Sequence, residues 1–337
     1  MYGFKFPLLL TCCHMLFSFL ALLPFMLSQA MMAKHADSLR RQWRGFVAIG
    51  LFMALNISLN NSSLVEMTLS LNQVIRASIP VFTCLLAIGI EGKVPTRGEA
   101  AALLILTSGV MLAVWDGAVA GSPRGILLCL AGTVSNALMM TTSGKVLSEK
   151  VDVLRLTFYT APISMAALTP FFLAREYSRF TQDYMPAHGA DVYTIVLATS
   201  AVALSYNVVH SLMIQQTSAV TTTVLGEVKI VGLMVLSYAL LGESKAFTPT
   251  MTAGCLTAVG GFCLYSHFKL VAAGGGSGSG AVGADVQLAR QPSEWIARLG
   301  SPERGSGAGG GGGGAGGAGG AGERVPLRKP MEKDASV

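Results

Sequence analysis

The sequence predicts an all-α polytopic membrane protein with about nine spans, on the grounds of its composition and the length of its apolar runs. Hydrophobic residues make up 52% and charged residues 12% of the 337 residues, and the mean hydropathy is +0.56. Soluble domains carry roughly 25% charged residues. The apolar runs are about 20 residues long, the length that crosses a bilayer. Because they are uniformly apolar and do not alternate, a transmembrane barrel is excluded.

The apolar runs place the expected helices in order along the chain, at residues 6–28, 45–65, 68–90, 98–116, 125–147, 153–174, 191–214, 219–241 and 250–268. The first run follows Lys5 and ends near Ser28-Gln29-Ala30, a pattern that a cleavable signal peptide also shows. We interpret it as a span because it is long and because His14 interrupts it. A transmembrane domain is therefore expected over residues 1–270.

Residues 271–337 have a different composition. Their Gly-rich stretches cannot bury enough apolar surface to offset the entropy lost on ordering, so we expect a flexible, disordered tail. Ten basic residues fall on the side of the loop at 29–44 and five on the other side, which places that loop and the tail in the cytosol. Since the basic residues are spread over several loops, we expect a lipid bilayer around the chain and no nucleic-acid partner.

The polar and reactive residues within the spans show no pattern of an enzyme. Six cysteines lie in the spans without metal or redox spacing, and we interpret them as small packing residues. Because no nucleophile–base set or phosphate-binding loop is present, neither catalysis nor a cofactor or metal is expected. Three Asn-x-Ser sequons begin at Asn56, Asn60 and Asn61, inside a span, where we interpret them as polar helix contacts.

Two cations within the spans give the main functional signal. Residues 70–115 can be laid on residues 222–266, so that Arg76 falls on Lys229 and, after a one-residue slip, Glu91 on Glu243 and Gly109 on Gly261. A charge inside hydrocarbon costs at least about 2.5–3.5 kcal/mol, so an ionisable residue in a span is by default a functional candidate. A charge kept in both halves of a repeat suggests a binding site shared between them, as in many secondary transporters.

Arg76 and Lys229 suit a phosphate or pyrophosphate, because arginine offers a planar fork of donors and lysine a compact charge. We expect both to face a water-filled cavity. Further candidates for substrate contact are polar residues on neighbouring spans, namely Gln73, Tyr159, Asn136, Asn207 and Thr222, with Asn72 close by. For these the alternative is an ordinary interhelical hydrogen bond. For the two cations the alternative is a structural ion pair with Glu227 or Glu66.

Four strings, in this order and spacing, give the chain a family resemblance. FKFPLLLTCCHMLFSF resembles the second helix of the nucleotide-sugar and triose-phosphate translocator family, within the drug/metabolite transporter superfamily. NISLNNSSLVEMTLSLNQVIRASIPVF resembles its third and fourth helices, GKVLSEK the end of its sixth, and TSAVTTTVLGEVKIVGLMVLSYALLGE its ninth. The resemblance implies an inverted-repeat bundle of ten helices with the substrate held between two five-helix halves. Because the match begins at the second helix, we expect the first to be missing.

The chain departs from the family pattern at several positions that matter for specificity. Plastid sugar-phosphate translocators have lysine where this chain has Arg76, a Lys-Arg pair where it has Lys229 and Ile230, and histidine where it has Ile57. The resemblance therefore implies a phosphate site that is only partly preserved. The Phe-Tyr-Asn-Asn element of GDP-mannose transporters is replaced here by residues 158–161, Phe-Tyr-Thr-Ala, which argues against guanine recognition of that type.

These observations imply an antiporter that works by alternating access. It would exchange a phosphorylated sugar or nucleotide sugar for phosphate or a nucleoside monophosphate, in the Golgi membrane or alternatively the plastid envelope or endoplasmic reticulum. A second hypothesis is a truncated, non-transporting paralogue that scaffolds or regulates a partner. An exporter of neutral metabolites is disfavoured by the two cations. The sugar, the nucleotide, the counter-substrate and the number of copies, a homodimer included, are left open.

Overall fold

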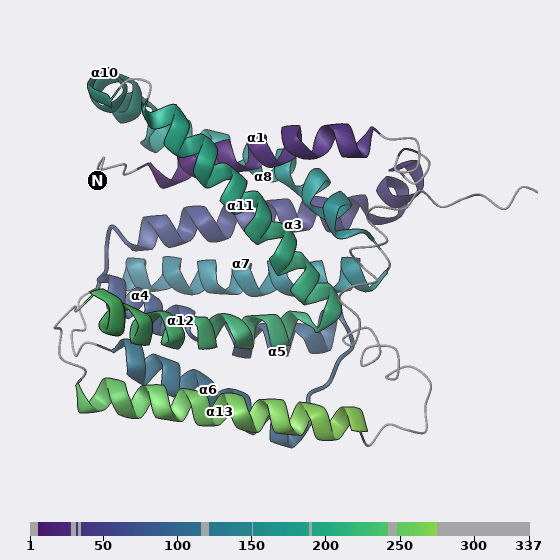
Figure 1. Cartoon of the computed structure of the whole chain (residues 1–337), viewed down its shortest axis with the longest axis vertical. Coiled ribbons are helices and arrows are strands. Elements are labelled where there is room, and N and C mark those ends of the chain that lie inside the picture. Colours follow the sequence, from purple (N-terminus) through teal and green to yellow (C-terminus); the bar gives the residue numbers. More distant parts are fainter. Residues whose placement is uncertain are drawn as a thin grey trace, which may run out of the picture. The chain divides into compact units, whose positions relative to one another are not determined.

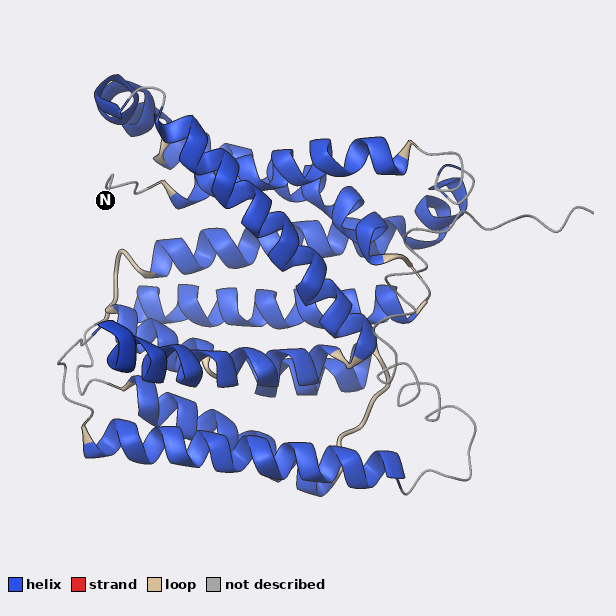
Figure 2. Ribbon diagram, in the orientation of Figure 1, coloured by secondary structure: helices blue, strands red, loops and turns tan. Residues whose placement is uncertain are grey.

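The computed structural model describes residues 6–27, 32, 35–115, 121–149, 151–188, 191–241 and 248–274, with side chains omitted at 187–191, 233–241 and 273–274. They belong to one compact unit, residues 1–291, so most of the predicted tail lies outside the described residues. The described part contains no sheet strand, and Figures 1 and 2 show an assembly of helices. The helices are α1 (Pro7–Met26), α3 (His35–Ser63), α4 (Leu69–Arg76), α5 (Ile79–Ile90), α6 (Arg97–Val114), α7 (Pro123–Ser148), α8 (Val153–Arg175), α9 (Tyr177–Arg179), the π-helical turn η1 (Phe180–Tyr184), α10 (Met185–His188), α11 (Asp191–Gln216), α12 (Ala219–Leu241) and α13 (Pro249–Gly274).

The prediction of a polytopic helical membrane protein is confirmed. Eight segments of the described chain are long and apolar enough to cross a membrane, with α4 and α5 counted as one. The helix α12, with 23 residues, coincides with the remaining predicted span. The first span packs within the bundle, where Glu176 accepts hydrogen bonds from the backbone N–H groups of Leu8 and Leu9 at 3.1 and 2.9 Å.

The helix α3 begins at His35, ten residues before the expected span, so the expectation of a loop up to residue 44 was wrong. This first part is polar, and the apolar-run criterion does not detect it. An exposed ion pair between Asp37 and Arg41, four residues apart on the helix at 2.8 Å, supports it locally. The helix therefore continues beyond the apolar segment.

The single span expected at residues 68–90 is divided into α4 and α5 at Ala77 and Ser78. The division follows from Pro80, which has no N–H to donate to the carbonyl of Arg76 in the preceding turn. Thr68 caps the start of α4 by accepting a hydrogen bond from the N–H of Leu71 at 3.4 Å. Arg76 is thus the last residue of a short helix within the membrane.

Glu66, between α3 and α4, marks one end of the bundle, and Glu91, directly after α5, marks the other. At the Glu66 end, the backbone N–H of Ser122 donates to the carbonyl of Glu66 at 3.0 Å, and Arg124 forms an ion pair with Glu66 at 3.5 Å. At the Glu91 end, Thr96 and Glu99 form a capping box that starts α6. The helices α3, α7, α11 and α12 run between these ends and enclose the centre of the bundle.

The helices α6 and α13 lie side by side, as Figure 1 shows, and they run antiparallel, because Gly98 lies against Phe268 and Gly254 against Ala113. A Cβ atom added at Gly109 would lie 2.3 Å from the backbone nitrogen of Ala258, and one at Gly261 would lie 2.4 Å from that of Leu106. Small residues therefore allow the two backbones to touch, as is common between membrane helices. The repeat that lays Gly109 on Gly261 also lays Leu106 on Ala258, so the two contacts are equivalent. This pseudo-two-fold relation agrees with the inverted repeat expected for the fold.

Candidate functional site

A cavity of about 540 Å³ lies at the centre of the bundle and is lined by α3, α4, α5, α7, α11 and α12. Its volume falls within the roughly 300–1,000 Å³ of small-molecule sites. Its polar lining consists mainly of amides, hydroxyls and three charged side chains. The lining residues are Met53, Asn56, Ile57, Asn60, Gln73, Arg76, Ile79, Asn136, Met139, Met140, Tyr206, Asn207, His210, Thr222, Thr223, Gly226, Glu227, Lys229 and Ile230.

Arg76 enters the cavity from the end of α4, next to the helix break. Its Nη1 donates a hydrogen bond to Oδ1 of Asn56 on α3 at 3.1 Å. The side chain is partly buried, and one neutral amide holds it without cancelling its charge. The remaining guanidinium donors keep the forked geometry that binds phosphate oxygens in pairs.

Lys229 lines the same cavity from α12, near the middle of that helix. Its Nζ lies 3.5 Å from the hydroxyl oxygen of Tyr206 and 5.4 Å from the centre of the Tyr206 ring. This is a cation–π arrangement, which positions the ammonium group without neutralising it. The Tyr206 ring in turn stacks on His210 at 5.7 Å between centroids. One turn of α11 therefore orients the lysine.

Glu227 is the third charged group of the cavity and is only 4% exposed. The ion pairs of the described residues do not include one between Glu227 and either cation, and Oε2 of Glu227 has no hydrogen-bond partner. Glu66, the other carboxylate considered as a partner, is bound to Arg124 and Ser122 instead. The geometry thus does not support structural ion pairing of Arg76 or Lys229.

The structure brings together six of the seven residues expected to contact substrate, and these are Arg76, Lys229, Gln73, Asn136, Asn207 and Thr222. Tyr159 is not among the residues that line the cavity. Its hydroxyl lies 2.5 Å from Nδ1 of His35, and its ring packs on Phe46 at 4.9 Å. The neighbouring Phe158 stacks on Phe19 at 4.8 Å. Both rings therefore join α8 to α1 and α3.

Sequence reasoning missed several lining residues, chiefly Asn56, Asn60 and Tyr206. The two asparagines were interpreted as helix contacts, and this holds in part, because Asn60 accepts a hydrogen bond from Asn72 at 3.1 Å. The available signal was their spacing of four residues, which places both on one face of α3. Asn72 itself is fully buried and does not line the cavity.

The family departures Ile57 and Ile230 both line the cavity. Where the resemblance implies histidine and a second cation in plastid members, this chain presents two apolar side chains to the same space. The site therefore carries less positive charge than the plastid pattern would give it.

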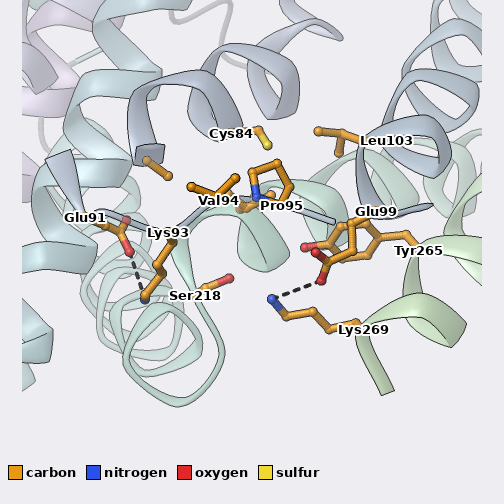
Figure 3. A pocket seen from close by; sticks show the side chains of 12 residues that line it. Cys84, Glu91, Lys93, Val94, Pro95, Glu99, Leu103, Ser218, Tyr265 and Lys269 are labelled. Carbon is orange, nitrogen blue, oxygen red and sulfur yellow. Dashed lines mark ion pairs between the residues drawn. The ribbon is translucent and has the colours of Figure 1, made fainter. Parts of the chain in front are cut away.

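A smaller pocket of about 60 Å³ lies at the Glu91 end, and Figure 3 shows its side chains. Lys93 pairs with Glu91 at 2.9 Å, and Lys269 pairs with Glu99 at 3.5 Å. The second pair joins α6 to α13, one helix from each half of the repeat. None of the expected substrate-contacting residues lines this pocket. Among the described residues, no group of three His, Cys, Asp or Glu could hold a metal ion.

Comparison with known proteins gives consistent matches. A family model described as the Triose-phosphate Transporter family matches residues 1–266. A probable sugar phosphate/phosphate translocator of Arabidopsis thaliana is 30% identical over 282 residues, which are 80% of this chain and 87% of the relative. UDP-uronic acid transporter 1 of the same plant is 29% identical over 238 residues, covering 68% and 75%. A solved crystal structure with 16% identity has a TM-score of 0.60 over 78% of this chain and 88% of its own, which supports the fold.

Proposed function

From the premise that the chain belongs to the Triose-phosphate Transporter family, we propose that it is an antiporter for phosphorylated sugars. The proposed substrate is a sugar phosphate or a nucleotide sugar, exchanged for inorganic phosphate or a nucleoside monophosphate. The family resemblance expected from the sequence motifs is confirmed, and the chain is a multi-pass membrane protein. We further propose the Golgi membrane as its location.

The observation that carries this proposal is the position of two cations in one central cavity. Arg76 and Lys229 come from different halves of the repeat, and each is held by a neutral group, Asn56 or Tyr206. A ligand with a phosphate would neutralise both, while the amides of the lining would bind sugar or base hydroxyl and carbonyl groups. The names of two relatives, a probable sugar phosphate/phosphate translocator and a UDP-uronic acid transporter, support the same ligand class.

Alternating access is proposed from the contacts that join the two halves at either end of the cavity. At the Glu66 end, the ion pair between Glu66 and Arg124 links the two halves. At the Glu91 end, the ion pair between Glu99 and Lys269 links them. Opening one set while the other stays closed would expose the cavity to one side at a time, as in other transporters built from repeats.

Counter-flow in proteoliposomes tests the proposal. Vesicles containing the full chain are preloaded with an unlabelled compound, and uptake of the labelled compound is measured for nucleotide sugars, nucleoside monophosphates, triose phosphates and inorganic phosphate. We expect trans-stimulated uptake of at least one phosphorylated sugar, lost in Lys229→Ala. A matched control is Lys145→Ala, which removes an exposed lysine of α7 outside the cavity. If folded, inserted protein gives no counter-flow with any compound, the transport proposal is wrong and a scaffold role is favoured.

A further inference from the structure

The formal charges of the central cavity do not match those of a phosphorylated ligand. Arg76 and Lys229 supply two positive charges, and Glu227 supplies one negative charge when it is ionised. A pyrophosphate diester or a fully ionised phosphate monoester carries two negative charges. With such a ligand bound and Glu227 ionised, the site would hold one excess negative charge within the membrane, where uncompensated charge is expensive.

Other titratable groups around Glu227 do not remove this excess. Tyr206 and His210 line the cavity from α11, and neither side chain carries a permanent positive charge. The linings from α3, α5 and α7 consist of amide, methionine and isoleucine side chains. The helices α6 and α13 also pack against α12 but contribute no residue to the cavity. Within the described residues, Glu227 is therefore the cavity group whose protonation would balance the charges, with His210 as the competing candidate.

The position of Glu227 supports a role in ligand binding. Its side chain lines the cavity, is 96% buried, and keeps Oε2 without a hydrogen-bond partner. Unsatisfied buried polar atoms are rare in folded proteins, and a carboxylate without a partner destabilises the fold. A carboxyl group that gains a proton becomes a hydrogen-bond donor. The protonated Glu227 could then donate to a phosphate or sugar oxygen of the ligand, which would give its side chain a hydrogen-bond partner.

We propose that Glu227 takes up one proton from solvent when a dianionic phosphorylated substrate binds and releases it when the substrate leaves. The inference rests on the proposed function of the cavity. It adds that the cavity binds a proton, on Glu227, together with the substrate. Each substrate then crosses together with one proton, so exchange of two dianions moves no net charge and no net protons. The coupling is visible in binding equilibria, not in net proton flux.

Calorimetry on the purified full chain measures this proton directly. UDP-glucose and sulfate serve as probes, because both keep two negative charges between pH 6.5 and 8.5. A phosphate monoester is unsuitable, because it titrates near pH 6 and would itself exchange protons. Titrations in two buffers of different ionisation enthalpy give the number of protons taken up per bound ligand. We expect the natural chain to take up as much as one proton per ligand, most at the alkaline end of this range, where the ligand-free carboxyl is ionised. The affinity should fall by up to tenfold for each unit by which the pH is raised.

Three variants locate the proton. Glu227→Gln should bind with little proton uptake and with an affinity that hardly changes with pH, while Glu227→Asp should retain the uptake. Glu91→Gln is the matched control, because the side chain of Glu91 is only 3% exposed and also has an oxygen without a hydrogen-bond partner, but Glu91 lies outside the cavity. It should retain the natural proton uptake, as should His210→Gln.

The outcomes separate the inference from the function beneath it. If neither probe binds at any pH, the proposed function is wrong and the inference fails with it. If a probe binds but the natural chain takes up no proton at any pH between 6.5 and 8.5, only the inference is wrong. Uptake that persists in Glu227→Gln, or that is lost in His210→Gln, assigns the proton to another group and likewise overturns it. If Glu227→Gln does not fold, the number of protons taken up by the natural chain and by Glu227→Asp, measured in the two buffers, decides whether binding is coupled to a proton.

Discussion

Gly109 of α6 and Gly261 of α13 occupy matching positions of the internal repeat, and each lies against the backbone of the helix that carries the other. Two equivalent contacts about a pseudo-two-fold axis therefore hold these helices together. The contact joins the halves of the repeat at a distance from the cavity, whose lining includes no residue of α6 or α13.

Enlarging either glycine should separate the two helices. In Gly109→Ala the added Cβ would lie 2.3 Å from a backbone nitrogen, so the helices must move apart, at a cost of about 1–3 kcal/mol typical of overpacking. A thermal-unfolding measurement in detergent should show a lower midpoint. The control is Gly260→Ala on the same helix, where nothing lies within 4 Å, and it should be neutral or slightly stabilising. Equal midpoints for the two variants would contradict this description of the interface.

Lys229→Ala should abolish most transport while the protein folds and reaches the membrane. A charge-assisted contact contributes about 1.5–3 kcal/mol, so the loss in apparent substrate affinity should be roughly ten- to hundredfold. Arg76→Lys should be partly tolerated, since it keeps the charge but loses the fork of donors. Counter-flow combined with thermal unfolding checks both variants.

The structural alternative predicts the opposite result for the same residue. If Lys229 formed a buried ion pair with Glu227, Lys229→Ala would destabilise the protein by about 3–5 kcal/mol. The double variant Lys229→Met with Glu227→Gln would then restore stability. Unchanged affinity and rate in a well-folded Lys229→Ala protein would exclude a role in binding.

Tyr206 should act through its ring more than through its hydroxyl. The Lys229 amine lies 5.4 Å from the ring centre, and the hydrogen bond to the hydroxyl is long at 3.5 Å. Tyr206→Phe should keep most transport, whereas Tyr206→Leu should raise KM about two- to fivefold, since a cation–π contact at an exposed site is worth about 0.5–1 kcal/mol. Steady-state uptake of the identified substrate measures the difference. Equal effects of the two substitutions would assign the role to the hydroxyl.

Removal of residues 275–337 should leave folding and transport nearly unchanged. The cut follows α13, and the family match ends before it, at residue 266. Gly-rich composition gives the removed segment little apolar surface for packing. Membrane expression and counter-flow of the shortened chain check the prediction, and a large fall in either would show that the segment has a role in the transporter.

A reporter attached to the chain end should be found in the cytosol, because basic residues favour the side of the loop at 29–44. Protease treatment of sealed vesicles tests this orientation. Cleavage of the reporter from the cytosolic face is expected, and its protection would reverse the assignment of the two ends of the bundle.

The spans were predictable because a segment that crosses the bilayer needs about 20 apolar residues, and runs of that length can be found directly in the sequence. The residues at which the helices begin and end were harder to predict. The polar first turns of α3 lie beyond the apolar segment, where hydropathy carries no signal. The break after Arg76 had a visible cause in Pro80, but hydropathy alone reads residues 68–90 as one continuous run.

The cavity was predictable where the residue type itself was unusual. Arg76 and Lys229 stand out because charges in spans are rare, and the structure places both in one space. Polar uncharged residues gave no such contrast. Tyr159 was expected to contact substrate and Asn56 to contact a neighbouring helix, yet Tyr159 turns toward His35 and Asn56 lines the cavity. Which face of a helix looks inward depends on how all the helices pack, and single positions do not contain that information.

The pairing of α6 with α13 also constrains how the protein is made. The helix α6 ends at Val114 and α13 begins only at Pro249, so α13 leaves the ribosome after every other described helix. Until then the glycine-containing face of α6 has no partner, and lipid or a membrane chaperone must cover it. Premature arrest of translation within α12 would leave that face open. Gly109 and the face of α6 around it are therefore covered by the protein itself only once α13 has inserted beside them.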